Sequence, residues 1–467
     1  MASTLHAAIA AHRFGLGEPD LRPIGNDPRG WLAAQIGAAD GARGSGLFDT
    51  RMALDHIAAE REKRRLARNP PPGMTAEQVL AGHYRDVILA DARSRLATAA
   101  FTQRPFAERL HWFWSNHFTV SQLKGATRGL VGAFERDAIR PNIAGRFETL
   151  LLAATTHPAM LRYLDNAQSA GPHSRVVVFE ARRAARLNES ARVTGINENL
   201  AREVLELHTL GAEAARAGVY AQADVTAFAA VLSGWRVGQN GLDPGAQPFD
   251  AAWHEPGSKV VLGRTYGEGA EALPRVLHDL ARHPATARFV ATKLARHFVA
   301  DEPPPALVER LAAVYLASDG QLGDVYRELL RDDLAWSPVP AKLKTPEEFV
   351  VSTARLLGGG ERMFERPEIG NVAAGINGLG QRVLAAPSPA GWSDRGEDWL
   401  GPDAVWKRVE WATRLAERAG RNVDARRLAA VSLGPLLGAE TARQIERAAD
   451  GPQALALLLL APEFQRR

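Results

Sequence analysis

The 467-residue sequence contains no cysteine. This absence excludes disulfides, thiolate metal sites and cysteine nucleophiles. Residues 1–17 also lack the basic start and the long apolar stretch of a signal peptide, so the sequence alone predicts a cytoplasmic protein. No stretch approaches the roughly 18 uninterrupted apolar residues of a membrane span, so we expect none.

Several catalytic motifs are missing as well. The chain has no His-Glu-x-x-His, no glycine-rich phosphate loop and no Gly-x-Ser-x-Gly elbow. The net charge is only +4, and basic residues are interleaved with acidic ones, which disfavours nucleic acid as a partner. Carboxylates, arginines, a few histidines and 10 tryptophans remain to carry any chemistry.

Apolar residues recur at helical spacing along most of the chain, which predicts a mainly α, multi-helical globule. Capping boxes at Thr75 and Thr345 predict two of the helix starts. The glycine- and proline-rich segment 237–268 instead predicts a small β-hairpin or sheet.

The length of the chain predicts more than one lobe. We predict an N-terminal helical lobe over 1–168 and a lid or excursion over 169–195, with an edge strand at 176–179. A second helical lobe over 196–467 contains the β insertion, and we expect the lobes to pack as one unit.

The stretch from Gly195 to Gly211 predicts a helix over 196–210 around which the rest of the chain is organised. Asn197 is suited to cap its start, and Gly211 is suited to end it. Placing residues at 100° steps separates two faces. Leu200, Ala201, Val204, Leu207 and His208 form the apolar face, and Glu198, Asn199, Arg202, Glu203 and Glu206 form the polar face.

The polar face supports two interpretations. Glu203 and Glu206 are three residues apart, which places their Cβ atoms roughly 5–6 Å from each other. Arg202 is four residues from both Glu198 and Glu206, so the face is either a solvated ladder of charges or a functional carboxylate pair. In the second case Arg202 holds one carboxylate ionised. On the opposite face, we predict that His208 is a core residue.

The same stretch resembles the signature of the bacterial domain-of-unknown-function 1800 family, through Asn197 to Asn199, Ala201 to Glu203, and Glu206 with Leu207. The resemblance names a family without a settled activity. Its members often carry export signals and occur with a companion family, which implies a periplasmic location and a companion protein as alternatives. Matching segments cover nearly the whole chain: 12–15, 114–118, 157–160, 163–166, Tyr220 with Asp224, 233–235, His254 and Glu255 with Lys259, and 387–392.

Tryptophans beside paired carboxylates are typical of carbohydrate-active sites, where rings stack on sugars and one acid protonates the leaving oxygen. Three consecutive aromatics, Trp112 to Trp114, cannot all face one way on a helix, so we expect at least one to leave the core stripe. The catalytic candidates are Glu203, Glu206, Arg202, Glu198, Asp224 and His254. The substrate-binding candidates are Asn199, Trp114, His117, Asp165, Trp235, Lys259 and Trp392.

These residues leave three functional hypotheses open. The first is a hydrolase or lyase on a cell-surface or extracellular glycan, with one of Glu203 and Glu206 as catalyst and Asp165, Asp224 or Glu255 as its partner. The second is a non-enzymatic scaffold whose carboxylates pair with arginines of a companion protein. The third is a metal site made by Glu203, Glu206 and His254. The sequence leaves the cofactor, the substrate and the oligomeric state undetermined.

Overall fold

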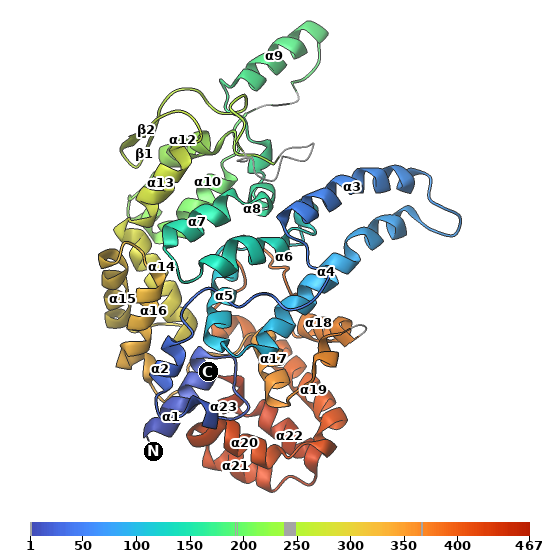
Figure 1. The fold of residues 1–467 in the computed structure, drawn as a ribbon, viewed down its shortest axis with the longest axis vertical. Helices are drawn as coiled ribbons and strands as arrows, with labels where there is room; N and C mark the ends of the chain where they lie inside the picture. Colours follow the sequence, from blue (N-terminus) through green and yellow to red (C-terminus); the bar gives the residue numbers. More distant parts are fainter. Residues whose placement is uncertain (1, 192, 194, 238–248, 366–367) are drawn as a thin grey trace.

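The computed structural model describes residues 2–467 except 192, 194, 238–248 and 366–367 (Figure 1). The mainly α prediction is confirmed. In the described part of the chain, the strands are β1 (Lys259–Val261) and β2 (Arg264–Tyr266), which pair antiparallel with Val260 opposite Thr265. This hairpin confirms the predicted β excursion, although residues 238–248 of that segment lie outside the described residues. No described helix is both long enough and apolar enough to cross a bilayer.

The first of two hydrophobic cores runs in sequence from Ala7 to Trp336, so the predicted boundaries at 168 and 196 both fall within its range. Figure 1 shows its helices in the upper and left part of the molecule. Helices contributing to it are α1 (Ala2–Ile9), α2 (Pro28–Ala33), α3 (Thr50–Arg68), α5 (Pro105–His117), α6 (Val131–Phe134), α7 (Phe147–Thr156), α8 (Pro158–Tyr163), α10 (Asn199–Glu203), α11 (Ala212–Arg216), α12 (Gln222–Leu232), α13 (Ala272–Ala281), α14 (Pro284–Phe298), α15 (Pro305–Ala317) and α16 (Leu322–Arg331).

The second core joins the C-terminal part of the chain to the long helix α4 (Ala76–Phe101). Both predicted capping boxes are present, at the starts of α4 and α17. The other helices of this core are α17 (Pro346–Leu356), α18 (Glu368–Gly378), α19 (Pro402–Ala419), α20 (Ala425–Leu433), α21 (Ala439–Glu446), α22 (Gly451–Leu460) and α23 (Pro462–Gln465).

Helix α5 contributes to both cores. Phe113 and Trp114 pack in the first core, whereas Trp112 packs in the second. All three rings are buried, and they divide between the two cores because consecutive helical residues point in different directions. The prediction that at least one aromatic leaves the core stripe is confirmed, and α5 has almost no face left for solvent.

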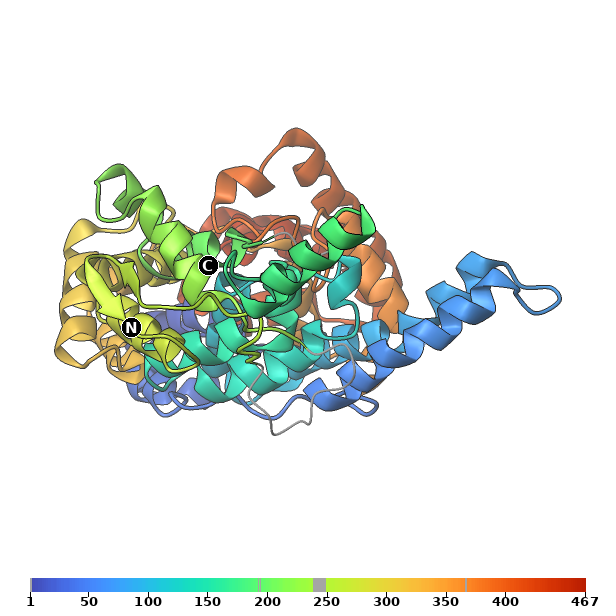
Figure 2. The same ribbon diagram turned by 90° about the horizontal axis from the view of Figure 1, so that it is seen from above.

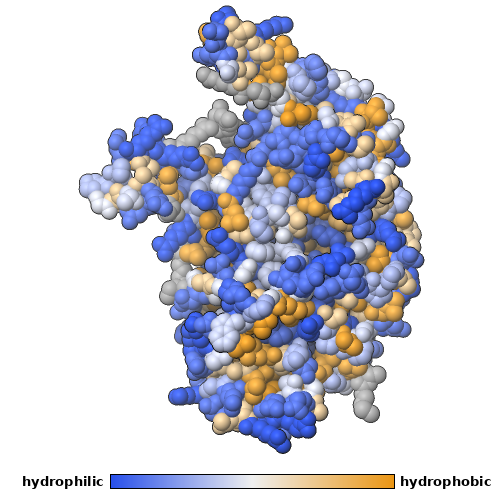
Figure 3. Space-filling view, turned by 180° about the vertical axis from the view of Figure 1, so that it is seen from behind, coloured by the Kyte–Doolittle hydropathy of each residue, from blue (hydrophilic) through white to orange (hydrophobic). Residues whose placement is uncertain are grey.

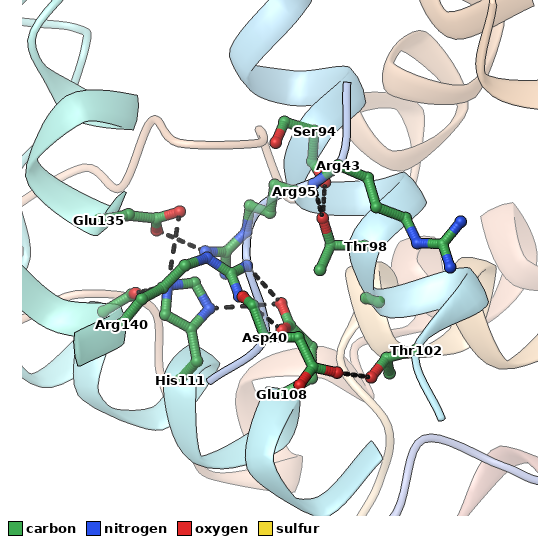
Figure 4. A network of polar contacts seen from close by, with 12 residues as sticks. Asp40, Arg43, Ser94, Arg95, Thr98, Thr102, Glu108, His111, Glu135 and Arg140 are labelled. Atoms are coloured by element: carbon green, nitrogen blue, oxygen red, sulfur yellow. Dashed lines mark hydrogen bonds and ion pairs between the residues drawn. The ribbon is translucent and has the colours of Figure 1, made fainter. Parts of the chain in front are cut away.

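Buried charges surround α5 (Figure 4). Arg140 donates two hydrogen bonds to Glu108, at 2.7 and 2.8 Å, and Arg95 pairs with Glu135 and with Glu347 of α17. A buried carboxylate is tolerated only when partners replace its lost hydration, and these arginines do so. The network therefore fixes α4, α5, η4 (Glu135–Ile139) and α17 relative to one another.

A second buried cluster joins α5 to α17 and to the last residue of the chain. Glu348 accepts one hydrogen bond from Arg109 and pairs with Arg467 at 3.0 Å. Arg467 also donates to the carbonyl of His297 at 2.6 Å. One carboxylate thus holds two buried guanidinium groups at the junction of the two cores.

Two elements project from the body, namely the α3–α4 hairpin and α9 (Arg175–Leu187) (Figures 1 and 2). The predicted edge strand at 176–179 is wrong, because these residues form the start of α9. Ser174 caps the helix by accepting the N–H of Val177, and alanines and arginines of high helix propensity follow the short valine run.

Candidate functional site

The central segment is a helix, but it is shorter and less regular than predicted. Helix α10 begins at Asn199 and continues as the π-helix η7 (Val204–Thr209). The N-cap residue is Glu198, which makes no side-chain capping bond, so the prediction that Asn197 occupies the N-cap is wrong. Asn197 lies one residue earlier, where its side chain accepts the N–H of Asn199 at 2.9 Å. Gly211 ends the segment with φ +89°, where an added Cβ would lie 2.7 Å from the Phe289 ring.

The π turn changes which residues are buried. Its backbone bonds run from residue i to i−5, as in the bond from the N–H of Leu210 to the carbonyl of Leu205, and the wider turn displaces the side chains that follow. Leu205 is buried, whereas Leu207, predicted on the apolar face, is only half-buried. His208 is buried as predicted. Single π turns inside helices occur frequently at functional sites.

Glu198 and Arg202 connect α10 to α12. Glu198 accepts hydrogen bonds from Thr226 at 2.6 Å, Gln222 at 2.8 Å and Arg202 at 3.2 Å. The bonds from Thr226 and Gln222 are the main reasons that the pKa of Glu198 lies below its ordinary value. Arg202 therefore pairs with Glu198 and not with Glu206, and both residues serve the packing of the two helices.

Glu203 and Glu206 are left as a pair without such partners. Both side chains are half-buried, and neither carboxylate accepts a hydrogen bond from any described residue. Burial, and then the negative charge of Glu206, raise the pKa of Glu203, against a smaller opposing effect of Arg202. A carboxyl group with a raised pKa keeps its proton closer to neutral pH and can donate it to a leaving group.

Two buried tyrosines lie close to this pair. Burial raises the pKa of Tyr163 to about 12, and the charge of Glu203 adds to the effect. Burial likewise raises the pKa of Tyr220, with a contribution from Glu206. Both phenols therefore stay protonated at neutral pH and can act as hydrogen-bond donors beside the carboxylates.

Asp165 and Asn199 lie at the edge of this region. Asp165 follows Tyr163 by two residues, has φ +59°, and pairs with Lys124 at 2.6 Å. Lys124 also donates to the carbonyl of Tyr163 at 2.7 Å, which connects Asp165 to the tyrosine beside Glu203. Asn199 is exposed at the start of α10. Among the described residues, the ion-pair partner of Asp165 is Lys124, and no contact joins its carboxylate to Glu203 or Glu206.

Asp224, His254 and Lys259 instead hold the β-hairpin segment. Asp224 accepts the N–H groups of Ala221 and of Leu262 in the hairpin turn, at 2.8 and 2.7 Å. His254 donates from Nδ1 to the Ser233 carbonyl at 2.7 Å and accepts from the Lys259 ammonium at Nε2, at 2.9 Å.

Both ring nitrogens of His254 are therefore engaged. Within the described ranges, no group of three or more histidines, aspartates or glutamates is arranged to hold a metal ion. The alternative that joined Glu203, Glu206 and His254 around a metal gains no support from this arrangement.

The predicted tryptophans lie in three different environments. Trp114 is fully buried in the first core, where its Nε1 donates to the Tyr326 hydroxyl at 2.6 Å. Trp235 is buried against Phe249. Neither ring has a face open to a sugar in this structure. Trp392 is half-buried, and its backbone exchanges two hydrogen bonds of 2.8 Å with the Asn116 side chain.

His117 connects α5 to the central segment. Its Nε2 donates to the carbonyl of His208 at 3.1 Å, and its ring is buried. His117 is thus a positioning contact for η7, and its ring has no open face toward a substrate. The Asn116–Trp392 contact is on the same helix, so the 114–118 segment holds both η7 and the loop at 387–392.

Several important residues were not identified from the sequence as site or positioning groups. Tyr163 and Asn166 lie in a segment already noted for its resemblance to the family. Asn166 is fully buried and donates to the carbonyls of Leu232 and Trp235, at 3.0 and 2.7 Å. Tyr220 also matched the family pattern, but nothing in the spacing indicated that it lies beside Glu206.

The fold and the site together define a mainly α protein organised around a short helical segment, α10 with η7, that carries a half-buried carboxylate pair. The family described as Protein of unknown function (DUF1800) matches residues 9–466, nearly the whole chain. The chain belongs to this family. No curated protein and no solved structure matches it.

Proposed function

We propose that this protein is a hydrolase or lyase that acts on a cell-surface or extracellular glycan, with Glu203 as the proton donor. The observation that carries the proposal is the state of Glu203, which is half-buried, has a raised pKa and accepts no hydrogen bond from the described residues. Carboxyl groups in this condition are typical general acids. Export to the periplasm, which the resemblance implies, would bring the protein to such substrates.

Glycoside cleavage needs a second carboxylate on the other side of the scissile bond, and Glu206 lies on the same helical segment as Glu203. Among the partners expected from the sequence, Asp224 accepts two backbone N–H groups, and Glu255 is held by the N–H and Nδ1 of His173. Asp165 is the remaining choice. Asp165 also has a partner, Lys124 at 2.6 Å, but it follows by two residues Tyr163, whose pKa is raised in part by the charge of Glu203. We assign Asp165 the role of base or nucleophile on this proximity to Tyr163.

Replacing Glu203 with glutamine tests this assignment, because an amide cannot donate the required proton. On any polysaccharide that the wild type cleaves, Glu203→Gln should lower kcat/KM by roughly 100-fold or more. The exposed Glu213 on α11 offers a matched control, and Glu213→Gln should keep the wild-type rate. A folded Glu203→Gln variant with the wild-type rate would contradict the proposal.

The carboxylate pair also supports the second candidate, a scaffold that binds a companion protein. Neither carboxylate has a hydrogen-bond partner in the described residues, so arginines of a companion protein can form ion pairs with both carboxylates. The two candidates differ in their response to substitution. If the pair is a docking surface, Glu203→Gln and Glu206→Gln should weaken binding of the companion to a similar degree. If Glu203 is the proton donor, Glu203→Gln should lower the catalytic rate far more than Glu206→Gln.

A further inference from the structure

Helix α9 projects from one end of the molecule and does not pack along any other described helix (Figure 1). Its start is fixed by the bond from the N–H of Val176 to the carbonyl of Ala252. Of its 13 residues, only Ala184 is buried. Isolated helices of this length are marginal in water, so a surface that covered α9 would stabilise it.

The exposed side chains of α9 combine positive charge with apolar groups. The helix carries four arginines and one glutamate, a net charge of +3. Arg183 pairs with Glu180 and Glu189, whereas the exposed Arg175, Arg182 and Arg186 form no ion pair with any described residue.

Between these arginines lie exposed apolar side chains. Phe179 is 63% exposed and Val178 is 38% exposed, while Leu187 near the outer end is 51% exposed. At 100° steps, Phe179 falls on the same side as Arg175, Arg182 and Arg186. The space-filling view from behind shows hydrophobic and hydrophilic atoms side by side on this projection (Figure 3).

The tip of the α3–α4 hairpin also combines exposed arginines with exposed apolar side chains, although Arg64 and Arg65 pair with Glu60 and Glu62 of the same helix. Leu66 and Met74 are each 47% exposed, and Arg64, Arg65 and Arg68 are exposed beside them. In Figure 1 both projections reach beyond the body toward the upper right, so one flat surface can touch both without meeting the body. Figure 2 shows α9 and the hairpin at similar heights in the perpendicular direction.

We propose that α9 and the tip of the α3–α4 hairpin bind the surface of an anionic lipid membrane. Helices with arginine beside phenylalanine and leucine bind at the interface, where the apolar side chains enter the acyl boundary and the arginines meet anionic headgroups. Two separate convex tips that reach a common plane fit a bilayer better than the concave groove of one protein partner. This inference does not depend on the proposed glycan chemistry.

Sedimentation of the full-length protein with lipid vesicles tests the proposal. The protein should pellet with vesicles of equal parts phosphatidylglycerol and phosphatidylcholine, bind vesicles of phosphatidylcholine alone much more weakly, and dissociate as salt rises. Reversing two charges in the variant Arg182→Glu/Arg186→Glu should weaken binding by roughly tenfold or more. Phe179→Ser should weaken it without changing its dependence on salt.

A matched control is the pair Arg414 and Arg418, which is exposed on α19 with the same spacing of four residues. Arg414→Glu/Arg418→Glu should bind the mixed vesicles like the wild type. The proposal is overturned if the wild type fails to pellet with mixed vesicles, or if charge reversal on α9 acts no more strongly than on α19. Binding to soluble polyglutamate without binding to vesicles would also overturn it, and would favour an acidic protein.

Discussion

Replacing Glu348 with glutamine should lower the free energy of unfolding by about 3–5 kcal/mol, as expected when one partner of a buried ion cluster is removed. Glu348 lies between Arg109 and Arg467, and all three side chains are buried. Burial alone would raise the pKa of Glu348, but Arg467 and Arg109 overcome this effect and hold the pKa below its ordinary value. The amide keeps the size of the side chain but leaves two guanidinium charges uncompensated.

Urea unfolding at neutral pH, followed by circular dichroism, measures this loss. Glu410→Gln on α19 is the matched control, because Glu410 pairs with Arg414 at the surface and its loss should leave the midpoint almost unchanged. If Glu348→Gln unfolds at the same urea concentration as the wild type, the cluster does not hold the two cores together as described.

Acid should destabilise the protein strongly below about pH 6, because several histidines are buried in their neutral form. Burial is the main cause that lowers the pKa values of His12, His157 and His208 to about 3. Between that value and the ordinary 6.5, the unfolded chain binds protons that the folded chain does not, so stability falls as pH falls. At about pH 4.5 each such histidine lowers the free energy of unfolding by about 2–3 kcal/mol relative to neutral pH.

Asp91 works in the opposite direction, because burial raises its pKa to about 6 and the folded state therefore gains a proton first. One such carboxyl group offsets only part of the stability that the three buried histidines remove in acid. The net expectation is a loss of stability that begins near the ordinary histidine pKa and grows toward pH 4.5.

The variant His208→Phe isolates the contribution of one buried histidine to this pH dependence of stability. Neither ring nitrogen of His208 has a hydrogen-bond partner among the described residues, so the substitution leaves no donor or acceptor unpaired. Urea unfolding at about pH 7.5 and 4.5 should show that the variant loses about 2–3 kcal/mol less than the wild type over this range. The neighbouring Phe118→Leu should lower stability equally at both pH values. An unchanged pH dependence for His208→Phe would show that this histidine titrates normally.

The fold class followed from local signals that tertiary contacts did not override. Helical spacing dominates the chain, and the capping boxes at Thr75 and Thr345 start helices as the pattern predicts. The edge strand predicted at 176–179 was wrong because four apolar residues in a row fit a strand or a helix equally well. The cap at Ser174 and the alanines and arginines that follow decide in favour of the helix.

The candidate site was predictable only in its central pair. Spacing on one helix brought Glu203 and Glu206 together, but it indicated neither the π turn over Val204–Thr209 nor the Phe289 ring beside Gly211. The partners of Glu198 come from α12, more than one element away. Likewise, Trp114 is buried by residues of the first core that lie far away in the sequence, such as Phe147 and Tyr326.

The central claim is that Glu203 lies beside Glu206 without a hydrogen-bond partner among the described residues, and that its ionised carboxylate destabilises the fold. Measuring melting temperatures tests this claim without a substrate. Because burial and Glu206 raise the pKa of Glu203, its ionised form destabilises the folded state at neutral pH. Glu203→Gln should therefore melt at a higher temperature than the wild type at pH 7, and this gain should fade as pH falls through the raised pKa and be absent below the ordinary carboxyl pKa. A melting temperature several degrees lower at pH 7 would show that this carboxylate stabilises the fold, and would contradict the account.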